Sequence, residues 1–435
     1  MNWSRYNYLF QSSKYGYLLY NALSNSFAEL DKEGYYYLKS VENKCNLDIE
    51  NSELYDSLIR MKVLVENDKD EFYNIKYLTH FNRFYDKYLE LTINPTLHCN
   101  FACAYCFEGA KPPIYMTEDV ENNIIDFIQK NKQAENIHIT WFGGEPLMAF
   151  NRIVSFTEKV KKLNISFTAN MITNGYLLSD KVIECLDDLN IGHIQITIDG
   201  LADVHDQRRP LVSGKGTFDK IVNNIDQLKN KKPKYPIVIR VNIDKTNEQQ
   251  YIDIFKFFIK RYSGRIYVTP GFVTEDHNCN TSDCLLERDK KVAFLLEQYK
   301  MHGLNVCGFY PQNYRYECPM RNPYHLVIGP EGELYKCWND VGNPVKVVGS
   351  LVDKEKINKS LLTRYYTAGD ALEDPKCREC FHFPTCGGGC PYLRIENEYN
   401  GKNYDMCDYI KGNLQEFLEL HYEFKQKQIK KDEKL

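Results

Sequence analysis

Six short runs rich in β-branched residues, each followed by a stretch of helical period, constrain the fold of this chain most. They occupy residues 89–97, 136–142, 165–173, 193–199, 236–244 and 265–273. Charged segments with helical spacing of apolar residues, such as 117–131 and 247–262, lie between them. Strands that alternate with helices indicate a parallel sheet, either doubly wound or part of a (β/α) barrel. Both architectures place ligand sites at the carboxyl ends of strands.

The segment before these repeats predicts a small module over residues 1–85. Residues 15–30 have the pattern of a strand, a turn at Asn25 and Ser26, and a second strand. Residues 31–41 and 50–65 predict two short helices, the first capped by Asp31. The order hairpin, helix, helix is typical of a winged-helix module. The alternative is an extension that merely packs on the next domain.

The segment after the repeats is loop-rich, because glycine, proline and cysteine become frequent beyond about Tyr310. Such a segment has little periodic apolar surface to bury, so we expect metals or clusters to stabilise it. The predicted domains are therefore residues 1–85, a barrel over 86–305, a loop-rich domain over 306–412, and a helix with a solvated, charged tail over 413–435.

Composition narrows the functional classes. The formal net charge of −4 gives no reason to expect binding to nucleic acid or to a membrane. We find neither an uncharged apolar run that could span a bilayer nor a secretory signal, which predicts a cytoplasmic protein. Because that compartment is reducing, the 15 cysteines indicate metal ligation rather than disulfides.

The first cysteine cluster directly follows the first strand and has the spacing C-x3-C-x2-C, formed by Cys99, Cys103 and Cys106. Three thiolates can each bind one iron of a 4Fe–4S cluster and leave the fourth iron open. A zinc site that borrows a distant fourth cysteine would fit this spacing less well. With Tyr105 before the last cysteine, the motif resembles the radical S-adenosylmethionine (SAM) superfamily. That resemblance implies a partial (β/α)6 barrel resembling a TIM barrel, and reductive cleavage of SAM to a 5′-deoxyadenosyl radical.

Residues at other strand ends match the same family. Gly143-Gly144-Glu145-Pro146 follows the second strand; alone it could be a plain turn, but the family uses this segment to contact the amino group of SAM. The resemblance implies the following cofactor-binding residues: Tyr105, Gly143, Gly144, Glu145, Asn174, Thr197, Arg209 and, as a weaker candidate, Asn242.

Seven further cysteines form a third pattern: Cys318, Cys337, Cys377, Cys380, Cys386, Cys390 and Cys407. Their order resembles the SPASM domain, which carries up to two auxiliary 4Fe–4S clusters; a pair of zinc ribbons is the alternative. The resemblance implies three clusters in all.

The resemblance also divides the seven auxiliary cysteines between two clusters. The outer cluster would be bound by Cys377, Cys380, Cys386 and Cys407, and the inner one by Cys318, Cys337 and Cys390. Tyr324 occupies the position of the usual fourth inner ligand. That inner site could be open, bind a substrate thiolate or recruit a cysteine such as Cys307. The other four cysteines are, for the most part, predicted to be small buried hydrophobes: Cys45, Cys185, Cys279 and Cys284.

The SPASM resemblance implies a peptide or protein substrate. Sulfatase maturases of this family have an Asp directly after the cysteine that corresponds to Cys337; here the residue is Trp338, and Asp340 is out of register. This favours a maturase of ribosomally made precursor peptides. As its reaction we expect the formation of a thioether between a cysteine sulfur and a carbon of the peptide. The N-terminal module would hold the leader peptide. The electron donor would be a ferredoxin or flavodoxin.

Three alternatives to this reading stay open. The first is a sulfatase maturase that forms formylglycine. The second is an enzyme that forms C–C links or epimerises residues. The third is a metal-stapled scaffold that binds peptides without catalysis.

Overall fold

The computed structural model describes residues 1–42, 44, 52–106, 108–109, 111–262, 264, 266–273, 285–304, 311 and 318–432. The chain divides into two compact units, which are described separately. Unit 1 comprises Met1–Phe84, Gly308–Pro319 and Thr367–Leu435. Unit 2 comprises Tyr85–Cys307 and Met320–Tyr366. The loop-rich segment 306–412 thus contributes to both units.

Unit 2 is built on a parallel sheet whose first six strands are neighbours in chain order. They are β6 (Tyr88–Ile93), β7 (Asn136–Trp141), β8 (Ser166–Thr173), β9 (Ile191–Thr197), β10 (Ile237–Ile243) and β11 (Ile266–Phe272). Their order never reverses, which distinguishes the sheet from a doubly wound one and agrees with a barrel-like arrangement. The six strands predicted from the sequence are confirmed, with small differences at their ends.

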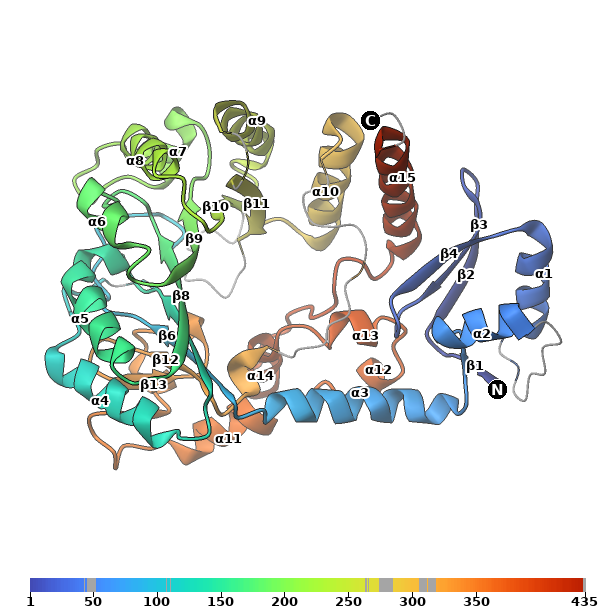
Figure 1. Cartoon of the computed structure of the whole chain (residues 1–435), viewed down its shortest axis with the longest axis horizontal. Helices are drawn as coiled ribbons and strands as arrows, with labels where there is room; N and C mark the ends of the chain where they lie inside the picture. Colours follow the sequence, from blue (N-terminus) through green and yellow to red (C-terminus); the bar gives the residue numbers. More distant parts are fainter. Residues whose placement is uncertain are drawn as a thin grey trace. The chain divides into compact units, whose positions relative to one another are not determined.

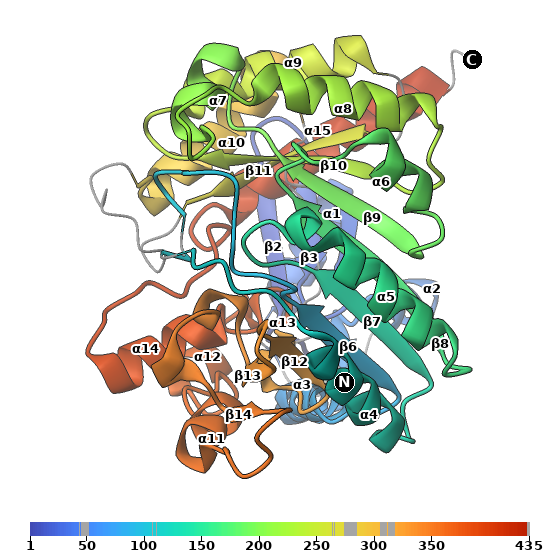
Figure 2. The same cartoon turned by 90° about the vertical axis from the view of Figure 1, so that its left-hand side faces the viewer.

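Helices cover the outer face of this sheet (Figures 1 and 2). They are α4 (Glu118–Lys130), α5 (Phe150–Lys161), α6 (Asp180–Cys185), α7 (Ala202–Arg208), α8 (Phe218–Asn230) and α9 (Tyr251–Arg261). In β10, every second residue is a fully buried Ile or Val, whereas Arg240 and Asn242 between them are half-buried. The outer face is therefore apolar, and the inner face carries the polar side chains.

Three later strands extend the sheet on the side of β6. The strand β12 (His325–Ile328) runs parallel to β6, and β13 (Glu333–Tyr335) and β14 (Gly349–Ser350) follow in antiparallel order. The remaining helices of unit 2 are α10 (Arg288–His302) and most of α11 (Lys359–Thr367). A short 3-10 helix, Trp338–Asp340, follows β13, and Lys336 and Cys337 lie between the two elements.

Unit 1 contains a three-stranded antiparallel sheet of β2 (Asn7–Ser12), β3 (Gly16–Asn21) and β4 (Ser26–Leu30). The helices α1 (Lys32–Val41), α2 (Ser52–Arg60) and α3 (Asp68–Arg83) follow, and β1 (Asn2–Trp3) pairs with β5 (Leu64–Val65). The predicted hairpin and first two helices are confirmed; Asp31 caps α1 by accepting from the N–H of Gly34 at 2.6 Å. The sequence prediction missed β1, β2 and α3. It also extended the second helix to residue 65, whereas α2 ends at Arg60 and residues 64–65 form β5.

The C-terminal part of unit 1 begins with three short helices, α12 (Pro375–Arg378), α13 (Phe383–Cys386) and α14 (Pro391–Asn400). The predicted last helix is present as α15 (Leu414–Asp432). Its residues Leu414 and Leu418 share one buried cluster with Tyr6, Leu18 and Tyr20 of the N-terminal segment. The beginning and the end of the chain therefore build one hydrophobic core.

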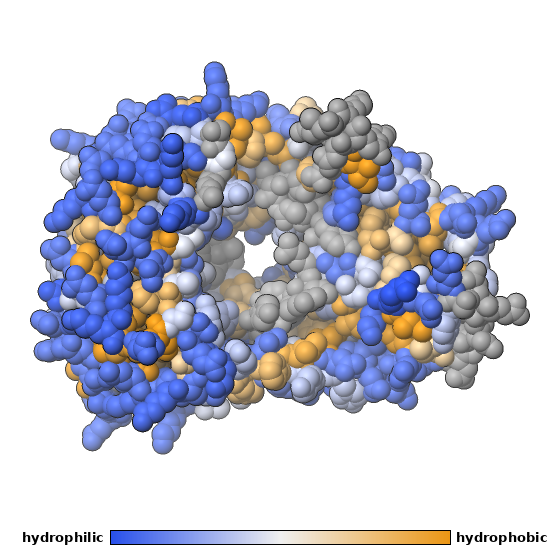
Figure 3. Space-filling model, in the orientation of Figure 1, coloured by the Kyte–Doolittle hydropathy of each residue, from blue (hydrophilic) through white to orange (hydrophobic). Residues whose placement is uncertain are grey.

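Hydrophilic residues dominate the face of the molecule in Figure 3, as expected where amphipathic helices turn their apolar sides inward. None of the helices in the described part of the chain combines the length and the apolar character that a membrane crossing would need.

Candidate active site

A cavity of about 300 Å³ lies in unit 2, lined by residues that follow the carboxyl ends of the parallel strands. All three cysteines of the first motif line it: Cys99, Cys103 and Cys106. Seven of the eight predicted cofactor residues line it as well: Tyr105, Gly143, Gly144, Asn174, Thr197, Arg209 and Asn242. Of these eight residues, Glu145 alone does not line the cavity; its side chain is buried. The sequence motifs, which are far apart in the chain, are thus brought together.

The glycines of the GGEP segment are required by the cysteine loop itself. The N–H of Gly144 donates to the carbonyl of Thr96 at 3.2 Å, and the N–H of Glu145 donates to the carbonyl of His98 at 2.9 Å. A Cβ atom on Gly144 would stand 2.4 Å from the carbonyl oxygen of His98. Only glycine lets the two backbones approach this closely. The segment therefore supports the loop that carries the cysteines.

The side chain of Glu145 is fully buried and bound within the protein. Its Oε1 accepts from the N–H of Leu147 at 3.0 Å and from the hydroxyl of Thr173 at 2.7 Å, and its Oε2 accepts from the N–H of Asn174 at 2.8 Å. Burial raises the pKa of this carboxyl, and these hydrogen bonds oppose the rise. A carboxylate engaged in this way holds the ends of β7 and β8 in register.

The hydroxyl of Tyr105 joins three polar residues. It donates to the buried Asp199, it accepts from Arg209, and Asn242 Nδ2 lies 3.2 Å away. Asp199 also accepts from the backbone N–H of Asn242 at 2.9 Å. Because these residues come from four separate segments of unit 2, the network fixes the position of Tyr105 inside the cavity. The sequence analysis did not select Asp199, although it follows Thr197 at the end of β9.

Burial affects the ionisation of two thiols of the first motif. Burial raises the pKa of Cys99 to about 12, while the nearby ammonium of Lys111 opposes that rise. Burial also raises the pKa of Cys106. A metal deprotonates such thiols on binding, which removes the cost of a buried thiolate. Lys111 itself is held by the carbonyl of Phe101 at 3.1 Å.

Two buried polar atoms in this region indicate room for a further ligand. Arg209 Nε and Asn100 Nδ2 have no hydrogen-bond partner among the described residues. Asn100 uses its Oδ1 to accept from Asn174 at 2.8 Å. Buried donors are normally satisfied, so their partners are expected to come from a bound molecule. The residues present fit a thiolate-ligated iron–sulfur cluster beside a polar cofactor.

The described residues of the site do not have the geometry of a single-ion metal site. In the described part of the chain, no three His, Cys, Asp or Glu side chains converge on one metal ion. A 4Fe–4S cluster does not require such convergence, since its thiolates bind separate irons.

The cavity is also lined by residues that the sequence analysis did not assign to cofactor binding. The rings of Phe142 and Trp338 lie 5.8 Å apart, and Asn339 stands beside them in the wall. Arg240 lines the cavity and donates to Asn242 Oδ1 at 3.3 Å. A signal for Arg240 was present, since a charged residue interrupts an otherwise apolar strand.

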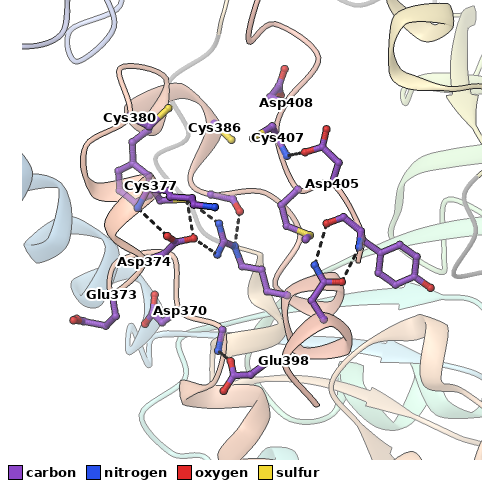
Figure 4. A pocket seen from close by; sticks show the side chains of 18 of the residues that line it. Asp370, Glu373, Asp374, Cys377, Cys380, Cys386, Glu398, Asp405, Cys407 and Asp408 are labelled. Carbon is purple, nitrogen blue, oxygen red and sulfur yellow. Dashed lines mark hydrogen bonds and ion pairs between the residues drawn. The ribbon is translucent and has the colours of Figure 1, made fainter. Parts of the chain in front are cut away.

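A second cavity, of about 900 Å³, lies in unit 1 and is lined by Cys377, Cys380, Cys386 and Cys407. These are the four cysteines predicted for the outer cluster, and Figure 4 shows them around one space. Gly389 makes this possible: a Cβ there would stand 2.2 Å from the carbonyl of Met406, next to Cys407. The turn after Cys386 therefore packs directly on the segment that carries Cys407.

The cysteines predicted for the inner cluster are distributed between the units. Cys390 is exposed and is not among the residues that line the cavity in unit 1. Cys318 belongs to unit 1 as well, whereas Cys337 belongs to unit 2. Of the remaining cysteines, Cys185 is half-buried in α6. Four lie outside the described residues: Cys45, Cys279, Cys284 and Cys307.

Comparisons with known proteins agree with this geometry. Residues 93–258 match the family model of the radical SAM superfamily. A serine-type anaerobic sulfatase-maturating enzyme from Bacteroides thetaiotaomicron is 30% identical over 73% of this chain and 86% of its own length. A cysteine-type enzyme from Clostridium novyi is 24% identical over 75% and 94%. The sporulation killing factor maturation protein SkfB from Bacillus subtilis is 30% identical over 39% and 40%.

Two solved structures share the fold. One is anSMEcpe with bound AdoMet and Kp18Cys peptide, with a TM-score of 0.59 and 18% identity over 77% of this chain and 97% of that one. The other is Streptococcus suis SuiB bound to precursor peptide SuiA, with a TM-score of 0.53 and 16% identity over 94% and 99%.

The fold and the comparisons define the class of protein as a SAM-dependent enzyme. This chain belongs to the radical SAM superfamily, among relatives of the anaerobic sulfatase-maturating enzymes. Membership implies SAM and a 4Fe–4S cluster as cofactors, and it sets aside the alternative of a non-catalytic scaffold.

Proposed function

We propose that this enzyme modifies a ribosomally made precursor peptide by forming a thioether between a cysteine sulfur and a carbon atom. The observation that favours a peptide maturase over a sulfatase maturase is the cavity wall after Cys337, which is formed by Trp338 and Asn339. Asp340 is 1% exposed and accepts from the hydroxyl of Tyr365 at 2.5 Å, so its carboxylate is engaged away from the cavity. The wall thus lacks the carboxylate that the resemblance to sulfatase maturases requires after this cysteine.

In this proposal, Cys99, Cys103 and Cys106 hold the cluster. When bound, the cluster and SAM supply the 5′-deoxyadenosyl radical that starts the chemistry. The chain's own groups orient the cofactor: Arg209 and Tyr105 present a guanidinium and a hydroxyl, and Gly143 and Gly144 keep the backbone close. Asn174, Thr197 and Asn242 offer further polar groups at the strand ends. Glu145 acts from behind by holding the strand ends together.

The C-terminal cysteines would form a SPASM arrangement with two auxiliary clusters. The cavity of unit 1 supports the outer site, because its four predicted ligands line one space. The inner site would use Cys318, Cys337 and Cys390. Tyr324 occupies the sequence position at which relatives carry the fourth cysteine ligand of the inner cluster. A substrate thiolate could provide that fourth ligand instead.

The N-terminal module would act as a winged-helix-like holder of the leader peptide. In the described part of unit 1, β4 pairs only with β3, so its other edge can receive a strand. Addition of a peptide strand at such an edge gives affinity through backbone hydrogen bonds. The structure of SuiB, which has a similar fold, contains the bound precursor peptide SuiA, and this supports the proposal. A cytoplasmic ferredoxin or flavodoxin would supply electrons.

A second candidate function is the maturation of sulfatases by formylglycine formation. It is favoured by the relatives from Clostridium novyi and Bacteroides thetaiotaomicron, which are sulfatase-maturating enzymes and align over most of their length. Peptide C–C cross-linking or epimerisation would use the same site.

Co-expression with a small cysteine-containing peptide encoded beside this protein tests the choice. We expect a loss of two hydrogens per link, and a cysteine that no longer reacts with iodoacetamide. Loss of two hydrogens with a reactive cysteine would indicate C–C linkage, and an unchanged mass with altered chirality would indicate epimerisation. Conversion of the cysteine to formylglycine would establish the sulfatase function. The matched control is Cys103→Ala, and product formation by that variant contradicts the whole scheme.

A further inference from the structure

Two cationic side chains reach the thiols that line the cavity of unit 1. Arg394, in α14, donates from Nη2 to Cys377 Sγ at 2.8 Å. Lys411 donates from Nζ to Cys407 Sγ at 3.5 Å. Neither residue belongs to the cysteine pattern in the sequence. Both contacts are to predicted ligands of the outer cluster.

The guanidinium of Arg394 is held in place by two further contacts. Its Nη1 donates to Asp374 Oδ2 at 3.0 Å, and its Nε donates to the carbonyl of Gly388 at 2.7 Å. The side chain is 12% exposed. Figure 4 shows Asp374 next to Cys377. Because three partners fix the guanidinium and water reaches little of it, its charge acts on Cys377 at a constant and short distance.

Such a charge affects the two redox states of a cluster unequally. A cluster that gains one electron becomes more negative by one unit, and its thiolates become stronger hydrogen-bond acceptors. A fixed positive donor therefore stabilises the reduced state more than the oxidised state, which raises the reduction potential. The effect is larger where the surroundings are poorly solvated.

We propose that Arg394 is a positioning residue that raises the reduction potential of the outer cluster through its hydrogen bond to Cys377. This inference rests on the proposed function, in which Cys377, Cys380, Cys386 and Cys407 hold that cluster. Lys411 acts in the same direction but more weakly, because its contact is longer and Cys407 is exposed.

Asp374 allows a test of the direction in which a nearby charge shifts the reduction potential of the outer cluster. Its Oδ2 lies 3.6 Å from Cys377 Sγ, so its negative charge opposes the effect of Arg394 on the same sulfur. Asp374→Asn removes that charge and keeps an oxygen that can accept from Arg394. Removal of the two charged neighbours should therefore shift the potential in opposite directions. A merely structural role of the pair would give no such opposition.

The experiment uses the full chain, loaded with clusters anaerobically, in which Cys99, Cys103 and Cys106 are replaced by Ala so that the first cluster is absent. A mediated redox titration followed by EPR gives the potential of each remaining cluster. The signal that disappears in an additional Cys380→Ala variant is assigned to the outer cluster. Lys376→Gln is the matched control, because Lys376 lines the same cavity and has no hydrogen bond to a sulfur in the described part of the chain.

In Arg394→Gln, we expect the ratio of reduced to oxidised outer cluster at a fixed ambient potential to fall about tenfold, which equals about 59 mV for one electron. The ratio should fall less in Arg394→Lys, and it should rise in Asp374→Asn. Lys376→Gln should change the ratio less than twofold, since Lys376 is exposed and water and salt screen its charge. If Arg394→Gln loses iron because its loop unfolds, Arg394→Lys and Asp374→Asn decide the question.

Two results would overturn the inference. One is a shift of the same sign for Arg394→Lys and Asp374→Asn; the other is a shift no larger than that of Lys376→Gln. Failure of the proposed function is distinguishable, because Cys380→Ala would then leave the iron content unchanged instead of lowering it by about four per chain.

Discussion

The carboxylate of Glu145 accepts a hydrogen bond from the backbone N–H of Asn174 at 2.8 Å, and through it the segment after β7 is joined to the end of β8. Its other oxygen serves Leu147 and Thr173. This carboxylate has three donors around it and no exposure to water. It is a structural support for the cavity.

Glu145→Gln should therefore destabilise unit 2. The amide of Gln presents an NH2 group, which cannot accept, to one of the donors, so a buried N–H loses its partner. Such a loss costs about 1–3 kcal/mol. Urea titration under anaerobic conditions measures the free energy of unfolding. Glu158→Gln, on the exposed side of α5, is the control, and equal values for the two variants would contradict this assignment.

Gly144→Ala should displace the cysteine loop. The added Cβ would meet backbone oxygens of Leu97 and His98 at 2.5 and 2.4 Å, and backbone atoms cannot rotate away as side chains can. We expect loss of the first cluster, measured as about four fewer irons per chain after anaerobic reconstitution. Gly192→Ala in β9 is the matched control, because its nearest neighbour would be 3.8 Å away. Full iron content in Gly144→Ala would show that the loop tolerates the shift.

Tyr105→Phe should weaken SAM binding while the cluster remains. The variant loses the hydroxyl that contacts Asp199, Arg209 and Asn242, so Arg209 is no longer fixed. We expect the dissociation constant of SAM to rise about tenfold, which corresponds to about 1.4 kcal/mol. Equilibrium dialysis measures this dissociation constant, and the iron content of the variant shows whether the cluster remains. Tyr267→Phe, on an exposed part of β11, should bind SAM normally. An unchanged constant in Tyr105→Phe would remove this residue from the cofactor site.

The buried His325 should make stability depend on pH. Burial, aided by Lys336, lowers its pKa to about 3, below the ordinary value near 6.5. A group with a depressed pKa stabilises the fold above its unfolded pKa, and that contribution is lost as the pH falls toward the folded pKa. Between pH 7.5 and 5.5 the expected loss is about 1.4 kcal/mol. The slope should diminish in His325→Gln but persist in His302→Gln, whose side chain is exposed. Identical slopes in all three proteins would contradict this prediction.

Much of the fold was predictable, because its signals are local. The β-branched runs of the six strands and the cap at Asp31 could be recognised within a few residues each. The cysteines and strand-end residues of the cavity were predictable for the same reason. Arg394 and Asp199 were not selected, because their roles depend on partners far away in sequence: Cys377 is 17 residues from Arg394, and Tyr105 is 94 from Asp199. The support role of the Glu145 side chain depends likewise on β8.

The shared core of the N- and C-terminal segments has a consequence for synthesis. Tyr6, Leu18 and Tyr20 are synthesised long before their partners Leu414 and Leu418, which lie far downstream in the chain. All strands of the sheet in unit 2 lie between these two segments, so that sheet can form during translation. The core of unit 1 closes only afterwards. A nascent chain stalled before residue 414 should therefore expose an apolar surface that chaperones recognise.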